Sequence, residues 1–245
     1  MTVVTANMGS KVCLILGTGC GIGYSVAKKW AEKGHKVILT RRSNVSQEDL
    51  EKEVGAGVVA VQCDVTDKGQ VHMTIDKIEE HYGTVETVIY NAGLGFFRKY
   101  GVETGSGIFQ KYDDVSVVDF ERCMATNTTG LLIVAQAVCP RMIARGRGVI
   151  GITGATATIR GKPVVSAFAP AKAAQKMLAE TLARDLGPQN IHVFYAVVDG
   201  VIKAETKNNQ FMDPEDIADT YWGLANQKKS AWTFELDLRS FSERW

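Results

Sequence analysis

The sequence lacks several features that mark specialised classes of protein. Its 245 residues include five cysteines without a CxxC spacing and four histidines without an HxxH or HxxxH pair. We therefore expect neither a disulfide framework nor a metal site. The cysteines are interpreted as reduced thiols in a reducing compartment, which predicts a cytoplasmic protein. They are Cys13, Cys20, Cys63, Cys123 and Cys139.

Long apolar runs and an excess of one charge are also missing. No apolar run reaches ~18 residues, and the first ten residues carry no apolar signal region, so we expect no membrane span and no signal peptide. The 28 basic and 27 acidic residues give a net charge of +1, which provides no reason to expect nucleic acid or a membrane as partner. The 45% hydrophobic content is ordinary for a globular chain of this length.

The chain does contain apolar runs that alternate with helical patterns. Val12–Leu16 ends in glycines, a helical pattern runs from Tyr24 to Ala31, and Lys36–Thr40 is a second apolar run. This order is strand, glycine turn, helix, strand. Because the alternation continues, we predict one α/β domain over 1–245 with a doubly wound, parallel, Rossmann-type sheet. Further strands are expected at Val58–Gln62, Val85–Tyr90, Gly148–Ile152, Ile191–Val198 and Ala231–Leu238, and further helices at Lys68–Tyr82, Phe120–Ala144, Phe168–Leu186 and from Asp213 onward.

A glycine-rich loop follows the first predicted strand. Such a string alone is compatible with a simple tight turn, but here an apolar strand precedes it and an amphipathic helix follows it. Glycines let the backbone approach a pyrophosphate, and the helix N-terminus offers N–H groups and a positive dipole. We therefore predict a dinucleotide site at Gly17, Thr18, Gly19, Cys20, Gly21, Ile22 and Gly23.

The end of the second predicted strand indicates which dinucleotide binds. NAD enzymes usually place a carboxylate there, whereas this chain has Arg41 and Arg42 followed by Ser43. Two guanidinium groups attract a 2′-phosphate and gain little from a hydroxyl. We predict NADP in preference to NAD, the alternative being a solvated basic surface.

These residues and four further elements resemble the short-chain dehydrogenase/reductase family over nearly the whole chain. Asp64 and Val65 match the family's acidic position facing the adenine, and Asn91-Ala92-Gly93 matches its Asn-Ala-Gly element. Asn127 lies where the family keeps a helix-bending, active-site asparagine. Lys172 matches the lysine of the Tyr-x-x-x-Lys motif. The resemblance implies that Lys172 binds the nicotinamide ribose and that Asn127 holds a water molecule or polar group.

The active-site hydroxyls of the family are missing. Phe168 stands at the tyrosine position four residues before Lys172, and Ala155 stands at the usual serine position. Gly161, at its family position, supports this register. The family's Pro-Gly after the sixth strand is Asp199-Gly200, of which Gly200 is retained as a cofactor-binding candidate.

Three residues are candidates to replace the lost hydroxyls. Thr153 and Thr156 bracket Ala155, although hydrogen bonding at a strand end and in a loop is the simpler interpretation. Asp199 ends a strand beside the expected nicotinamide, where it is a base or simply a turn residue. Weaker alternatives are Tyr24 with Lys28, Ser166, Tyr100 and Tyr112.

Two functions remain open at this point. The first is an NADP-dependent oxidoreductase that acts on a small or partly apolar carbonyl or alcohol through a non-standard active site. The second is an inactive NADP-binding sensor, scaffold or partner subunit, suggested by the paired loss of both hydroxyls. General acid–base help contributes ~10²–10⁴-fold, so its loss predicts slow turnover rather than none.

The resemblance also suggests a lid and an oligomer. The variable substrate-lid region falls at about 199–212; Val201–Phe211 is short, which predicts a shallow or open site. The two long helices, Phe120–Ala144 and Phe168–Leu186, resemble those through which the family dimerises, so we expect a homodimer or homotetramer. The C-terminal segment, with Trp232 and Trp245, is a second candidate interface. Candidate pocket aromatics, for which core packing is the alternative, are Phe96, Phe97, Tyr100, Phe109, Phe168, Phe211 and Trp222.

Overall fold

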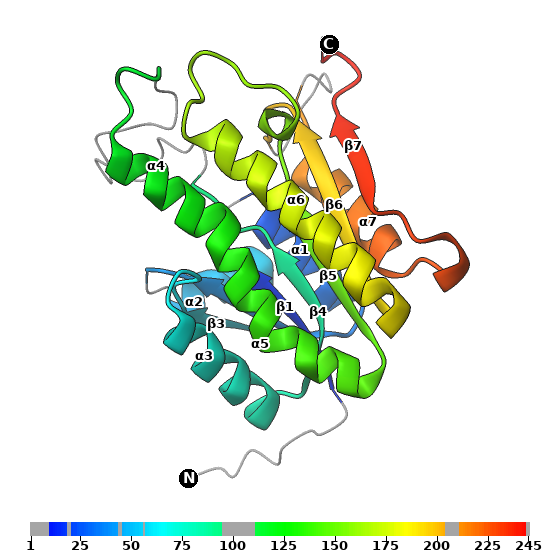
Figure 1. The fold of residues 1–245 in the computed structure, drawn as a ribbon. Helices are drawn as coiled ribbons and strands as arrows, with labels where there is room; N and C mark the ends of the chain where they lie inside the picture. Colours follow the sequence, from blue (N-terminus) through cyan, green and yellow to red (C-terminus); the bar gives the residue numbers. More distant parts are fainter. Residues whose placement is uncertain are drawn as a thin grey trace.

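The computed structural model describes residues 10–18, 21–43, 46–55, 57–94, 111–203 and 211–243. Its strands form one sheet in the order β3-β2-β1-β4-β5-β6-β7, and every neighbouring pair is parallel (Figure 1). The expected Rossmann-type fold is confirmed. The strands are β1 (Lys11–Leu16), β2 (Lys36–Arg41), β3 (Val58–Gln62), β4 (Thr84–Tyr90), β5 (Gly148–Thr153), β6 (Ile191–Asp199) and β7 (Glu235–Arg239).

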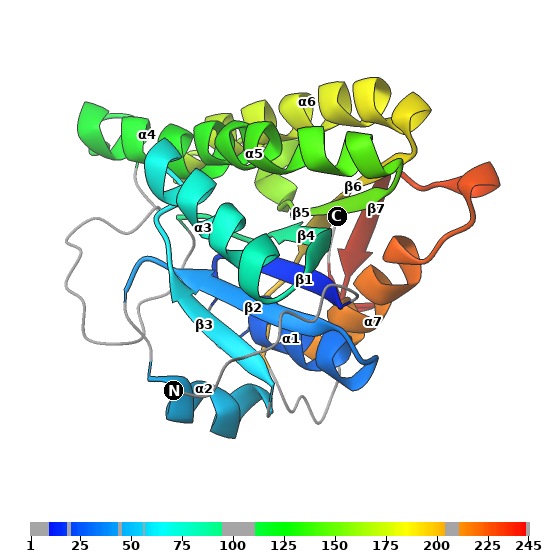
Figure 2. The same ribbon diagram turned by 90° about the horizontal axis from the view of Figure 1, so that it is seen from below.

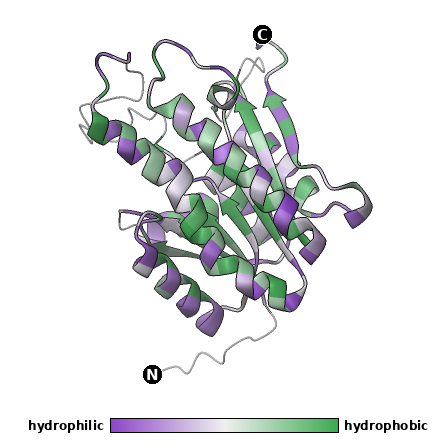
Figure 3. Ribbon diagram, in the orientation of Figure 1, coloured by the Kyte–Doolittle hydropathy of each residue, from purple (hydrophilic) through white to green (hydrophobic). Residues whose placement is uncertain are grey.

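Helices cover both faces of this sheet. Helices α3, α5 and α6 lie on one face, and α1, α2 and α7 lie on the other (Figure 2). The inner strands are largely apolar, as Figure 3 shows, because they are buried between the two helical layers, whereas polar and apolar residues alternate in the edge strand β7. The helices are α1 (Ile22–Glu32), α2 (Gln47–Val54), α3 (Lys68–His81), α4 (Val117–Met124), α5 (Gly130–Arg145), α6 (Phe168–Leu186) and α7 (Pro214–Ala225).

Strand β1 illustrates how the sequence builds two cores. Val12, Leu14 and Leu16 pack into the cluster beneath α3, α5 and α6. Cys13 and Ile15 pack into the cluster beneath α1, α2 and α7. Successive side chains of a strand point to opposite faces, so an uninterrupted apolar run supplies both cores at once.

Helix α2 and the start of β7 differ from the sequence prediction. The short helix α2 was not expected; Ser46 caps it by accepting a hydrogen bond from the Asp49 backbone N–H. The last strand begins at Glu235 rather than Ala231, because Lys229–Ala231 forms a short 3₁₀ helix. The predicted start of α7 is confirmed, since the Asp213 side chain caps its first turn.

The long helix predicted at Phe120–Ala144 is longer and not uniform. Helices α4 and α5 are joined by a π-helical turn at Ala125–Thr129, which puts a continuous helical path over Val117–Arg145. Among the described residues this helix is long and apolar enough to cross a membrane by length and composition alone. However, 61% of its most apolar window is buried inside the protein, and a core helix passes the same test.

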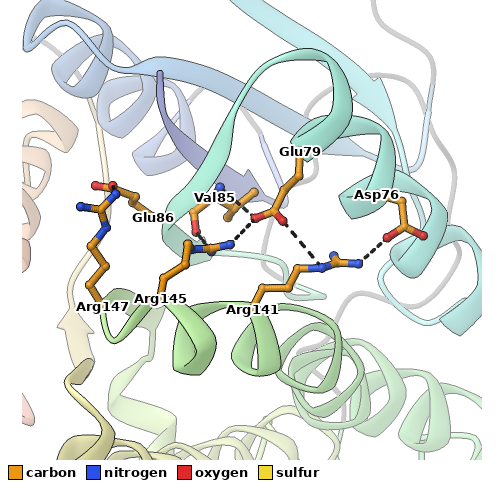
Figure 4. A network of polar contacts seen from close by, with 7 residues as sticks. All are labelled: Asp76, Glu79, Val85, Glu86, Arg141, Arg145 and Arg147. Carbon is orange, nitrogen blue, oxygen red and sulfur yellow. Dashed lines mark hydrogen bonds and ion pairs between the residues drawn. The ribbon is translucent and has the colours of Figure 1, made fainter. Parts of the chain in front are cut away.

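A network of ion pairs fastens α3, β4 and α5 at the amino ends of the strands (Figure 4). The Glu79 carboxylate lies 3.1 Å from Arg145 and 3.7 Å from Arg141, and the Arg145 guanidinium also donates to the Val85 carbonyl at 3.0 Å. Ligands bind at the opposite, carboxyl ends of strands in this fold. We therefore assign a structural role to this network, which further includes Asp76, Glu86 and Arg147.

Candidate functional site

The glycine loop leaves β1 in close contact with the segment that leaves β4. Gly17 has a φ of +82°, and the Asn91 side-chain amide donates to its carbonyl at 2.7 Å. A Cβ added at Gly17 would lie 2.2 Å from the Cα of Ala92. The Gly17 and Thr18 N–H groups both donate to the Thr40 carbonyl of β2. Both the backbone angle and the contact with Ala92 therefore require glycine at position 17.

Helix α1 begins directly after this loop. A Cβ added at Gly23 would lie 3.2 Å from the Gly17 carbonyl oxygen, so the first turn packs closely on the loop. A Cβ at Gly21 would meet no described atom within 4 Å, and the first turn carries no acidic residue. This helix start can therefore receive an anion. The predicted loop residues Gly19 and Cys20 lie outside the described residues.

The predicted NADP-selective residues lie at the end of β2, one residue beyond Thr40. Arg41 is half-buried and donates from Nε to the Ser43 hydroxyl at 3.2 Å, whereas Arg42 is exposed. On the neighbouring strand end, Asp64 accepts from the Thr66 backbone at 2.9 Å and from its hydroxyl at 2.8 Å. These contacts hold the Asp64 carboxylate in one orientation, and Val65 beside it is buried.

Lys172 of α6 is buried at the carboxyl end of β5. Its ammonium donates to the Thr153 carbonyl at 2.8 Å and to the Gln175 side-chain oxygen at 3.0 Å. Burial lowers the pKa of Lys172 to about 7, and the Cys123 thiol has a smaller, raising effect. At neutral pH, Lys172 is therefore present in both protonated and neutral forms.

Asn127 lies in the π-helical turn and faces Lys172. Its side-chain amide donates to the Cys123 carbonyl at 3.0 Å, while its buried Oδ1 has no hydrogen-bond partner among the described residues. A Cβ added at Gly93 would lie 2.9 Å from this Oδ1 and 3.7 Å from the Lys172 nitrogen. The fold thus brings together three predicted site residues that are far apart in the sequence.

Phe168 and Ala155 occupy an apolar corner of the same region. Phe168 is 6% exposed and packs in a small cluster with Val165 and Ala169, against which half-buried Ala155 and Ala157 are placed. The Lys172 nitrogen lies 5.8 Å from the centre of the Phe168 ring. Where the resemblance implies two hydroxyl groups, this chain therefore places carbon atoms.

The three stand-in candidates all make internal contacts. The Thr153 hydroxyl accepts from the Tyr221 hydroxyl at 3.0 Å, and the Thr156 hydroxyl donates to the Asp199 carboxylate. Asp199 also faces the guanidinium groups of Arg160 at 3.3 Å and Arg239 at 3.5 Å. These contacts agree with the simpler interpretation of Thr153 and Thr156, which is hydrogen bonding at a strand end and in a loop.

Known proteins provide an independent comparison. The family model for short chain dehydrogenase matches residues 11–216. The chain belongs to the short-chain dehydrogenase family. It is 26% identical over 230 residues to an NADP-dependent 3-hydroxy acid dehydrogenase of Salmonella typhi, with 87% of this chain and 88% of the relative covered. It is 30% identical over 248 residues to a 3alpha-hydroxysteroid dehydrogenase of Mediterraneibacter gnavus, with 93% and 94% covered.

A solved structure gives the same family placement. The alcohol dehydrogenase of the archaeon Thermococcus sibiricus, complexed with 5-hydroxy-NADP, matches with a TM-score of 0.79 and 25% identity over 96% of this chain and 98% of that one. The names of these three proteins indicate chemically different substrates, so the comparisons establish the family of this chain but not its substrate.

Several weaker candidates lie away from the site. Lys28 pairs with Glu215 of α7 at 2.6 Å, and Tyr24 faces Glu53 and Arg41, where burial is the main cause of its raised pKa. Trp222 packs edge-on against Trp30, with ring centroids 5.1 Å apart. Tyr112, Phe211 and half-buried Ser166 are described, with Tyr112 the most exposed of them. Outside the described residues lie Phe96, Phe97, Tyr100, Phe109, Trp245 and positions 204–210 of the predicted lid.

The sequence prediction missed two polar residues next to Lys172. Gln175 is fully buried and contacts both Lys172 and the Asn127 carbonyl. The buried Tyr195 hydroxyl of β6 lies 3.4 Å from the Gln175 oxygen and 2.8 Å from the Thr158 hydroxyl. A signal was available for Gln175, since a residue three positions after Lys172 on a helix shares its face.

Proposed function

We propose that this chain is an NADP-dependent oxidoreductase that transfers a hydride between NADP and a carbonyl or alcohol group of a small or partly apolar substrate. The observation that carries the proposal is the convergence of Lys172, Asn127 and Gly93 at the carboxyl ends of the strands. Asn127 Oδ1 is a buried acceptor without a described partner, and a polar group of a ligand entering the site would satisfy it.

NADP is favoured over NAD by charge at the end of β2. Arg41 and Arg42 follow Thr40, whose carbonyl anchors the glycine loop through the Gly17 and Thr18 N–H groups. The loop therefore holds the pyrophosphate region and the guanidinium groups near each other, as a 2′-phosphate requires. The relatives that bind or depend on NADP support the same choice.

The remaining residues are assigned to roles around this cofactor. When bound, NADP supplies or accepts the hydride. Lys172 binds the nicotinamide ribose and, with a pKa of about 7, can hold or release a proton at its Nζ atom at neutral pH. Asn127 accepts a hydrogen bond through Oδ1 from a water molecule or from the hydroxyl group of an alcohol substrate. Gly200 completes the cofactor-binding set, and Thr153, Thr156 and Asp199 stay as secondary catalytic candidates.

One assay tests this function. Purified protein is mixed with NADPH and a panel of aldehydes, ketones, quinones and activated alkenes, and nicotinamide absorbance is followed. We expect slow turnover that Lys172→Ala abolishes and that Lys176→Ala leaves intact, because Lys176 is held in an ion pair with Glu235 of β7 at 2.6 Å. Tight NADPH binding without turnover across the panel would exclude the oxidoreductase.

A cofactor-binding protein without redox chemistry is the second candidate. The apolar cluster around Phe168 favours it, and so do the internal hydrogen bonds of Thr153 and Thr156, because both threonine hydroxyls already have partners within the protein. This candidate predicts the opposite result in the same assay: NADPH affinity is retained and no substrate is turned over.

We further propose a cytoplasmic homodimer or homotetramer in which 1–245 folds as one domain with a lid region at about 199–212. The exposed apolar side chains of Leu132, Ile143 and Met177 on α5 and α6 support association through these helices. Light scattering with size-exclusion chromatography measures the assembly; a monomer at all concentrations would refute it.

A further inference from the structure

Gln175 lies on α6, where its side chain contacts both Lys172 and the π-helical turn. Its side-chain N–H donates to the Asn127 carbonyl at 2.8 Å, and its Oε1 accepts from the Lys172 ammonium at 3.0 Å. The orientation of the amide follows from its partners, because an ammonium only donates and a carbonyl only accepts. Gln175 is fully buried, so water does not compete for either bond.

We propose that Gln175 is a positioning residue of the active site, whose amide couples the Lys172 ammonium to the backbone of the asparagine turn. The inference rests on the function proposed above only for the role of Lys172 toward the cofactor. The amide fixes the lysine nitrogen between Gln175 and the Thr153 carbonyl, and it ties α6 to the turn that carries Asn127. A change in the charge of Lys172 is therefore transmitted to the Asn127 backbone through one side chain.

The groups around Lys172 leave its titration isolated near neutral pH. The Cys123 thiol faces it from α4, and the Tyr195 hydroxyl faces Gln175 from β6. The Tyr221 hydroxyl of α7 reaches Thr153 on β5. Burial raises the pKa of Cys123, Tyr195 and Tyr221, so all three stay neutral between pH 5 and 8. Over this range Lys172 is the group that titrates in the cluster.

A titration by nuclear magnetic resonance tests the coupling without measuring turnover. Lysine side chains carry ¹³C at the ε position, glutamine side chains carry ¹⁵N, and Lys172→Met and Gln175→Met assign the two signals. In the unmodified protein we expect the Gln175 amide signal to shift with pH at the Lys172 midpoint and to exchange slowly with solvent. A Gln175 signal that does not shift at the Lys172 midpoint would overturn the proposal, and the pH titration itself is carried out on the unmodified protein.

Two substitutions then move the midpoint in opposite directions. Gln175→Glu places a carboxylate against the ammonium and should raise the Lys172 midpoint by ~1–3 pH units, whereas Gln175→Leu removes an acceptor and should lower it. A merely structural role would give equal midpoints in both variants, and that result would refute the inference. Turnover is measured separately, so the two proposals can fail independently. If the coupling is present but no substrate is turned over, the oxidoreductase function is refuted and the role of Gln175 is not. If substrate is turned over but the coupling is absent, the role of Gln175 is refuted and the oxidoreductase function is not.

Discussion

The two halves of the carboxyl edge of the sheet differ in how many of the family's motif residues they retain. Around β1 and β4, Gly17 lies against Ala92 and accepts a hydrogen bond from the Asn91 side chain, residues that carry the family resemblance. Around β5 and α6, Phe168 and Ala155 carry no hydroxyl. In the proposed function, the first half binds the dinucleotide through close approach of the backbone, and the second holds the reacting groups on side chains.

This difference shows which substitutions the fold tolerates. A side chain at position 17 would collide with Ala92 and strain the loop, so that half changes only at the expense of folding. Replacing a tyrosine with phenylalanine in a buried cluster keeps the ring and its packing. The half around β5 and α6 can therefore change while the protein remains folded and the proposed dinucleotide site around Gly17 is kept.

The largest effect is expected from restoring both hydroxyls. The double variant Phe168→Tyr with Ala155→Ser should raise carbonyl reduction by ~10²–10⁴-fold, the usual contribution of a general acid with a polarising partner. Nicotinamide absorbance measures it. Phe168→Leu with Ala155→Ser is the control, because it lacks the phenol and should gain nothing. No gain despite intact NADPH binding would mean that the two halves differ by more than the hydroxyls.

The second largest effect is expected from a side chain at Gly17, in the half of the site proposed to bind the dinucleotide. Gly17→Val should lower NADPH affinity by more than ~100-fold and reduce the melting temperature, since its Cβ would lie 2.2 Å from a backbone atom at a positive φ. Fluorescence titration and thermal melting measure the two changes. Gly161→Ala is the matched control, because a Cβ there meets no described atom within 4 Å. Unchanged affinity in Gly17→Val would place the dinucleotide elsewhere.

A smaller change should separate the two cofactors. Replacing Arg41 and Arg42 with alanine should weaken NADPH binding about 10–100-fold and leave NADH binding nearly unchanged, because a hydrogen bond to a charged group contributes ~1.5–3 kcal/mol. Arg184→Ala, which removes an exposed partner of Glu180, controls for loss of positive charge. The proposal fails if the unmodified protein already prefers NADH.

The smallest effect concerns the pH dependence of stability. Lys172 has a pKa of about 7 in the folded protein and 10.5 as its ordinary value, so between these values the unfolded chain binds more protons. Stability should therefore rise with pH from 7 to 9, by about 2 kcal/mol more in the unmodified protein than in Lys172→Met. Urea unfolding at both pH values measures this; Lys176→Met should retain the full increase. Parallel pH profiles for the unmodified protein and Lys172→Met would contradict the lowered pKa.

Most of the fold could be predicted because its strands are buried on both faces. Continuous apolar runs located six strands closely. Helix α2 was missed since only Leu50 and Val54 are buried in an otherwise polar segment. The start of β7 was misplaced because the alternation begins at Ala231, which ends a 3₁₀ helix, whereas pairing with β6 begins only at Glu235.

The candidate site was predictable where motifs carry it and not where partners come from distant segments. Lys172, Asn127 and Asn91 are placed by local sequence elements. The partners of Thr153 and Asp199 are not, because Tyr221 and Arg239 lie many residues away and only the fold brings them near. Gln175 lies between these cases, since its spacing from Lys172 was visible but its contact with the Asn127 turn was not.

The π-helical turn at Ala125–Thr129 determines where the helical path from α4 to α5 can lose a residue. The Tyr90 hydroxyl donates to the Thr126 carbonyl at 2.5 Å, and a Cβ added at Gly130 would lie 2.4 Å from the Tyr90 hydroxyl oxygen. A π turn holds one residue more than the α-helix around it. Deleting one residue here would let the segment become continuous α-helix and keep the apolar face of α5 on the sheet, whereas a deletion within α5 would rotate the residues after it by about 100°. A single-residue deletion in the turn should therefore preserve cooperative unfolding, and one in the middle of α5 should abolish it; urea unfolding measures both.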